Sequence, residues 1–223
     1  MRNINERYVT ETYADDGQLA TFEVHCEPSF NFAYDVVDDI ALADPDRTAM
    51  VWCNPEGEEH VFTFADMKYW SDKTANFFAE CGIGRGDFVM VILRRHYQFW
   101  FTMLALEKLG AVAVPATFML KEHDLTYRLK GADIKAVVCT SAGDIADVVD
   151  AVAGECPSVE TLILVNPAGA GLTAQDADGA WLIGEGELAG PALSGPEGIC
   201  AAPAERAGWR DFNSEVRAAP ADF

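Results

Sequence analysis

The sequence predicts an α/β fold in which a doubly wound, mostly parallel sheet is flanked by helices. The stretch 86–120 reads as an apolar strand, an apolar helix and a second short strand that Pro115 stops. Beyond its first turn the helix carries only Glu107 and Lys108 as charges, which is typical of a helix covered on several sides. Strands and helices then alternate as far as Val165, and this alternation favours parallel strands joined by right-handed crossovers.

The first part of the chain is predicted to be an irregular lead-in followed by a helix. Residues 1–30 are polar and show no clear period, whereas residues 31–43 have the spacing of a helix that Asp44-Pro45 ends. In this helix one stripe is apolar and the opposite face is acidic and predicted to be solvated. The apolar stripe consists of Phe32, Val36 and Ile40, and the acids are Asp35, Asp38 and Asp39.

A hairpin and a capped helix are expected next. Thr48–Cys53 and His60–Phe64 read as two short strands around the turn-rich residues 54–57. A capping box from Thr63 to Asp66 then begins a helix that Gly82 ends. Its inner face is predicted to contain Met67, Trp70, Thr74, Phe77, Phe78 and Cys81, and its outer face Asp66, Lys73, Asn76 and Glu80.

After the central unit the pattern continues for two more strands and then changes. The expected order is a helix over 121–132, a strand over 135–140, a helix over 144–153 and a strand over 161–165. Residues 31–166 therefore form the predicted α/β subdomain. Alanine, glycine and proline dominate residues 167–207, which we predict to be a mobile insertion. Order is expected to resume at 208, with a short helix within 208–223.

Composition excludes several classes of partner. A formal net charge of −20 and a pI near 4.3 argue against nucleic acid and against an anionic membrane surface. The N-terminal residues are too polar for a signal peptide, and charges and Pro115 interrupt the longest apolar stretch, so no membrane span is predicted. The six cysteines are scattered without a Cys-x-x-Cys pair. We therefore expect a cytoplasmic protein without disulfides or zinc.

The glycine-rich run Gly82 to Asp87 looks at first like part of a phosphate loop. A dinucleotide-binding loop follows a strand and opens a helix, so that the helix N-terminus meets the phosphate. Here a helix precedes the run and a strand follows it. We interpret the run as a helix stop and a tight turn.

The best candidates for ligand contact follow two strands of the predicted sheet. Arg94-Arg95 come after the first strand of the central unit, and 117–119 follow the second. Ligands of open α/β sheets bind at the carboxyl ends of the strands, and paired guanidinium groups can bind a phosphate or a carboxylate. Ordinary exposed arginines facing the many acids are the alternative interpretation. His96 likewise has two interpretations, either as a ligand contact or as a polar residue at the start of a helix. Composition and spacing alone leave the function open.

Residues 31–165 resemble, in order, the AMP-forming acyl-CoA synthetases of the adenylating-enzyme superfamily, and most closely the medium-chain acyl-CoA ligases. The resemblance rests on collinear short motifs, namely FTFAD at 62–66, GxGD at 84–87, LGAV at 109–112, PxT at 115–117 and DLxYRL at 124–129. In addition, GWxDF at 208–212 is similar to the segment that lies shortly before the family's phosphate loop.

The resemblance implies a two-step reaction that uses ATP, Mg²⁺ and CoA. A carboxylic acid is first adenylated with release of pyrophosphate, and the CoA thiol then displaces AMP. The family's phosphate loop, magnesium-binding acid, ribose-binding aspartate and adenylation lysine have no counterpart in these 223 residues. The resemblance therefore implies no catalytic residue and no metal ligand here, and none of the cofactors is expected to bind this chain alone. Arg95, Thr117 and Met119 match positions beside the acyl and pantetheine path, so they are the expected substrate-binding residues.

Two functions follow from this resemblance. In the first, the chain is the first subdomain of a truncated acyl-CoA synthetase and is inactive alone; such a piece should expose an apolar face and self-associate. In the second, the chain is a non-catalytic α/β binding or interaction module derived from that family. A module adapted to stand alone should be a monomer or a closed oligomer.

Overall fold

A five-stranded parallel sheet forms the centre of the protein. The computed structural model describes residues 4–53, 59–166 and 206–223. The order of the strands in the sheet is β6-β5-β7-β8-β9, and every neighbouring pair is parallel. Their bounds are β5 (Phe88–Ile92), β6 (Val112–Pro115), β7 (Ala136–Thr140), β8 (Thr161–Val165) and β9 (Arg210–Asp211). The chain turns first to one side of β5 and then to the other, so the predicted doubly wound topology is confirmed, with its switch point between β5 and β7.

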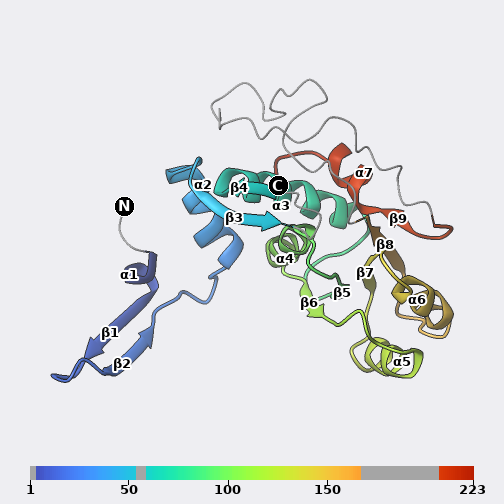
Figure 1. Ribbon diagram of the computed structural model, residues 1–223, viewed down its shortest axis with the longest axis horizontal. Helices are drawn as coiled ribbons and strands as arrows, with labels where there is room; N and C mark the ends of the chain where they lie inside the picture. The colour runs from blue at the N-terminus through green and yellow to red at the C-terminus, as the bar shows by residue number, and fades with distance from the viewer. Residues whose placement is uncertain (1–3, 54–58, 167–205) are drawn as a thin grey trace.

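Helices cover both faces of this sheet (Figure 1). On one face lie α3 (Phe64–Glu80), α4 (Gln98–Leu109) and α7 (Phe212–Ala218), and on the other lie α5 (Glu122–Gly131) and α6 (Ile145–Ala153). Alternate residues of β5 enter the two cores, Val89 and Val91 on the α4 side and Met90 and Ile92 on the α5 side. A strand buried on both faces must be apolar throughout, which explains the unbroken apolar run in the sequence.

The expected hairpin and capped helix are both present. Strands β3 (Thr48–Cys53) and β4 (Glu59–Thr63) pair antiparallel, while the predicted turn at 54–57 lies outside the described residues. At the start of α3, the Asp66 amide donates to Thr63 Oγ1 (3.1 Å) and the Thr63 amide donates to Asp66 Oδ2 (2.8 Å), which confirms the capping box. The outer-face prediction is wrong for Asp66 and Lys73, which are buried. Asp66 turns back to the cap, and the Lys73 ammonium donates to the Ala219 carbonyl beyond α7.

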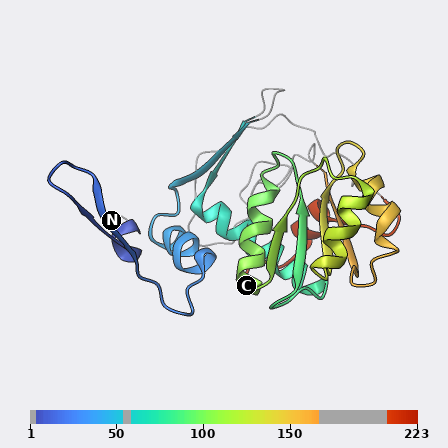
Figure 2. The ribbon, with the colours of Figure 1, turned by 90° about the horizontal axis from the view of Figure 1, so that it is seen from below.

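The N-terminal residues differ from the irregular lead-in that the sequence predicts. Residues 4–24 form a short helix, α1 (Ile4–Tyr8), and an antiparallel hairpin of β1 (Val9–Tyr13) and β2 (Leu19–Val24). The turn is closed by a hydrogen bond from the Ala14 amide to the Gln18 carbonyl (2.8 Å), with Gly17 at φ 81°. This hairpin projects away from the sheet and its helices in both views (Figures 1 and 2).

Of the predicted insertion 167–207, residues 167–205 lie outside the described residues. The chain continues from 206 with β9 and α7, so the expected return of order near 208 is confirmed. Phe212 and Val216 of α7 are fully buried against the α3 side of the sheet.

The helix expected over 31–43 is present, but its buried face differs from the prediction. It consists of a π-helix, η1 (Ala33–Asp38), that continues into α2 (Asp39–Ala43). A π-helix is wound more widely than an α-helix, so a period of 3.6 residues does not identify its inner face. Phe32 of the predicted apolar stripe is 49% exposed, whereas Asp38 of the predicted solvated face is buried.

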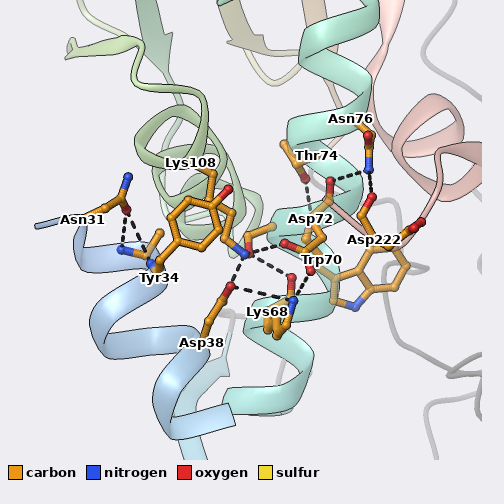
Figure 3. A network of polar contacts seen from close by, with 12 residues as sticks. Asn31, Tyr34, Asp38, Lys68, Trp70, Asp72, Thr74, Asn76, Lys108 and Asp222 are labelled. Carbon is orange, nitrogen blue, oxygen red and sulfur yellow. Dashed lines mark hydrogen bonds and ion pairs between the residues drawn. The ribbon is translucent and has the colours of Figure 1, made fainter. Parts of the chain in front are cut away.

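Asp38 is buried because it belongs to a charged cluster that joins three helices (Figure 3). The ammonium of Lys108 on α4, whose side chain is 0% exposed, donates to Asp38 Oδ1 of η1 (3.0 Å) and to Asp72 Oδ1 of α3. Lys68 of α3 lies beside both carboxylates, and the ring of Tyr34 lies 5.4 Å from the Lys108 nitrogen. Burial raises the pKa of the Asp38 carboxyl, against the opposing charge of Lys108. We call these four charged residues the Lys108 cluster.

Substitution Lys108→Met is expected to reduce the free energy of unfolding by about 3–5 kcal/mol, because the two buried carboxylates lose their buried counter-charge and keep only the partly exposed Lys68. Urea denaturation at neutral pH measures this loss. The matched control is Arg7→Gln, which breaks the exposed pair of Arg7 and Asp39 and should lower the free energy of unfolding far less. Equal losses in the two variants would contradict the role given to the cluster.

Candidate functional site

Two loops meet at the carboxyl edge of the sheet, where the sequence predicts ligand contact. One follows β5 and contains Arg94 and Arg95; the other follows β6 and contains residues 116–119. The Arg94 guanidinium lies 4.0 Å from the centroid of the Phe118 ring, a cation–π contact that holds the loops together. The Ala116 amide donates to the Val91 carbonyl (2.9 Å), which extends the β5–β6 ladder into the second loop.

The three predicted substrate-binding residues all lie on these loops and are exposed. The carbonyl oxygen of Arg95 accepts a hydrogen bond from the indole N–H of Trp52 on β3 (2.6 Å), which fixes the loop backbone and leaves the guanidinium outside. Thr117 Oγ1 accepts a bond from the Met119 amide (3.3 Å), and Met119 is 69% exposed. Within the described ranges, no hydrogen bond joins the side chains of these three residues. The fold thus places Arg95, Thr117 and Met119 at one edge without pairing them.

His96 lies beside these loops at the switch point of the sheet. It is buried, and its Nε2 is 2.8 Å from the hydroxyl of Thr140 at the end of β7. Thr140 Oγ1 also accepts a hydrogen bond from the Ala142 amide (3.0 Å). Burial, together with the positive charge of Arg94, lowers the pKa of His96 to about 4, so the ring is neutral near pH 7. His96 is therefore a neutral link between the ends of β5 and β7. Sequence reasoning did not identify Thr140; its only signal was a polar residue ending an apolar strand.

The glycine-rich turn lies at the other end of β5. Gly82 and Gly86 have φ angles of 77° and 84°, and the Gly84 amide donates to Asp87 Oδ2 (2.8 Å). The ammonium of Lys135 donates to the same carboxylate oxygen (2.9 Å). The interpretation of this run as a helix stop and a tight turn is confirmed, and it is remote from the carboxyl edge.

Among the described residues, no three His, Cys, Asp or Glu side chains come together as a metal site would require. The cysteines in those ranges, Cys26, Cys53, Cys81, Cys139 and Cys156, are free thiols. A search of the same ranges for a helix with the length and hydrophobicity to cross a bilayer found none.

The chain folds as an α/β sheet with two loops at its carboxyl edge, and comparison with known proteins identifies its family. Residues 37–200 match the family described as AMP-binding enzyme, so the chain belongs to that family. This confirms the resemblance found in the sequence.

Curated relatives include acyl-coenzyme A synthetases described as mitochondrial. ACSM4 of Rattus norvegicus is 37% identical over 145 residues, which cover 62% of this chain and 25% of the relative. ACSM2A of Homo sapiens is 36% identical over 146 residues, which cover 61% of this chain and 24% of the relative. The alignment thus spans about a quarter of the length of these relatives.

Solved structures with the same fold include a CoA ligase and a fatty acyl CoA synthetase. The anthranilate CoA ligase AuaEII, in complex with anthranoyl-AMP, gives a TM-score of 0.59 at 17% identity, over 89% of this chain and 30% of its own. A fatty acyl CoA synthetase of Mycobacterium tuberculosis gives 0.54 at 24% identity, over 60% of this chain and 26% of its own. At this identity the likeness concerns the fold.

His96 predicts a pH dependence of stability. Because its pKa is about 4 in the folded chain and near 6.5 when unfolded, the unfolded state binds the extra proton between these values. Stability is therefore complete above pH 6.5 and falls by about 3 kcal/mol as the pH drops to 4. Urea denaturation across this range should show a shallower fall in His96→Gln than in the wild type. His123→Gln, at an exposed position on α5, should keep the wild-type slope. An unchanged slope in His96→Gln would contradict the assignment.

Proposed function

We propose that this chain is the first α/β subdomain of an AMP-forming acyl-CoA synthetase, an acid–thiol ligase for a medium-chain fatty acid or a related acid. The observation that carries the proposal is the family match over 37–200, in a fold that brings Arg95, Thr117 and Met119 to one edge. The chain spans about a quarter of the length of its relatives, and the rest of the ligase would supply the phosphate-binding parts.

In the proposed reaction, a carboxylate oxygen attacks the α-phosphorus of ATP and pyrophosphate leaves. The CoA sulfur then attacks the acyl carbon, and AMP leaves. The first step requires Mg²⁺ and cationic donors to neutralise phosphate charge. The described residues contain no cluster of His, Cys, Asp and Glu side chains that fits a metal, so Mg²⁺ is assigned to none of them.

This chain contributes residues that line the proposed path of the acid and of CoA. The exposed Arg95 guanidinium offers a positive charge to an approaching carboxylate, and its backbone is held by Trp52. The thioether of Met119 offers a flexible apolar surface to an acyl chain. Thr117 sets the direction of that loop through its bond to the Met119 amide.

The alternative, a non-catalytic interaction module, is favoured by one observation. Both faces of the sheet are covered by helices of this chain, as a subdomain that folds alone requires.

Self-association through an exposed face and a cytoplasmic location are further parts of our proposal. The curated relatives are described as mitochondrial, so fractionation of cells that express the tagged protein would decide the location.

The purified 223-residue chain should give no acid-dependent exchange between ATP and pyrophosphate, because the phosphate-binding donors are proposed to lie elsewhere in the ligase. Incorporation of labelled pyrophosphate into ATP, with octanoate as the acid, measures this. A reaction without acid provides the background. Exchange above that background would contradict the division of roles proposed for this chain.

Octanoate should bind weakly at the carboxyl edge and shift the NMR signal of the Met119 methyl group. Arg95→Gln should lower the affinity about tenfold, because a charge-assisted hydrogen bond is lost. The control is Arg128→Gln, at an exposed position on α5, which should bind octanoate as the wild type does. A Met119 signal that does not respond to octanoate, or an Arg95→Gln variant with unchanged affinity, would count against these residues as the acid site.

A further inference from the structure

The N-terminal arm, which we define as α1, β1 and β2 (residues 4–24), has one apolar face. Residues paired across an antiparallel hairpin share a face, and Val9 pairs with Val24 while Glu11 pairs with Phe22. Tyr13 lies two residues beyond Glu11 and donates its hydroxyl to Glu11 Oε2 (2.7 Å), so it shares that face. Tyr13 is 60% exposed, Phe22 55% and Val24 61%, so the described part of the chain leaves this face uncovered.

The other face of the arm is polar. Thr12 pairs with Thr21 and their hydroxyls are hydrogen-bonded, while the Thr10 hydroxyl lies 2.8 Å from His25 Nε2. A two-stranded hairpin is marginally stable by itself in water, and an amphipathic one gains stability when its apolar face is covered. Grouped exposed apolar side chains of this kind mark interaction sites.

The base of the arm is fixed while its tip stands free of the sheet (Figures 1 and 2). Arg7 pairs with Asp39 of α2, and the Tyr8 hydroxyl donates to the Asp35 carbonyl of η1 (3.0 Å). The Tyr8 ring also packs edge-on against Phe30, with centroids 5.0 Å apart. A surface held in position in this way loses less conformational freedom when a partner binds.

Charge determines which partner fits. The arm contains the acids Glu6, Glu11, Asp15, Asp16 and Glu23 and a single base, Arg7, which is paired with Asp39. Nucleic acid and anionic membranes are repelled by such a surface. A second copy would bring the same acids and a further net charge of −20. A partner with basic side chains beside its apolar ones is complementary.

We propose that the apolar face of the arm (Val9, Tyr13, Phe22 and Val24) docks a segment of another protein that combines apolar side chains with lysine or arginine. The apolar side chains of the partner cover Phe22, Tyr13 and Val24. Its basic groups face Glu11, which the Tyr13 hydroxyl holds within the apolar face. This docking surface lies on the arm, outside the carboxyl edge, and does not depend on the proposed ligase activity.

Two synthetic strand peptides of equal length test the proposal on the full ¹⁵N-labelled chain, one alternating valine with lysine and one alternating valine with glutamate. The amide signals of residues 9–24 should shift with the lysine peptide and stay unchanged with the glutamate peptide, and added salt should weaken binding. Phe22→Ser should reduce the affinity about tenfold or more, because a buried aromatic contact is lost. Thr21→Ala, on the polar face, is the matched control and should bind as the wild type does.

Glu11→Gln keeps the proposal testable if Phe22→Ser disrupts the hairpin. This variant retains the apolar face, and it should bind the lysine peptide more weakly and with less salt dependence. Equal binding of both peptides, or signals of residues 9–24 that respond to neither, would overturn the proposal. Signals of residues 9–24 that change with protein concentration in the absence of peptide would also overturn it, since a second copy would then be the occupant of this face.

Discussion

The arrangement of the helices depends on a lysine that the fold buries completely. Lys108 brings its ammonium between Asp38 and Asp72, and so ties η1 and α3 to the end of α4. A buried ion cluster of this kind adds little net stability over apolar packing, but removing one member leaves charges without a partner. The Lys108 cluster joins η1, α3 and α4, and we expect it to favour this arrangement of the three helices over others.

The Lys108 cluster lies at the C-terminal end of α4, and the candidate ligand edge of the sheet lies near its N-terminal end. Because α4 connects β5 to β6, fixing its C-terminal end at the Lys108 cluster also sets the start of the helix, where His96 meets Thr140. The loops after β5 and β6 are then held by contacts of their own, Arg94 on Phe118 and Trp52 on the Arg95 carbonyl. The exposed side chains of Arg95 and Met119 thus extend from loops whose backbones are held by these contacts, as a binding surface requires.

The sheet and its carboxyl edge could be predicted from the sequence because their signals are local. Apolar runs bounded by Gly86 and Pro115 define the strands, and parallel strands bring their ends to one edge. The burial of Asp38 could not be predicted, because its partner lies 70 residues away on another helix. The hairpin was missed because threonines and acids separate its apolar residues, and no core residue opposes them. His96 was recognised as a candidate, but its partner Thr140 is set by strand order.

We propose that this chain is one subdomain of a larger adenylate-forming ligase. The most direct test is an immunoblot of a denatured lysate from the source cells, with an antibody raised against residues 31–165. The account predicts a band well above the 24.3 kDa of this chain, because its relatives are about four times longer than the matched region. A band at 24.3 kDa with no larger species would contradict the claim and favour a stand-alone interaction module.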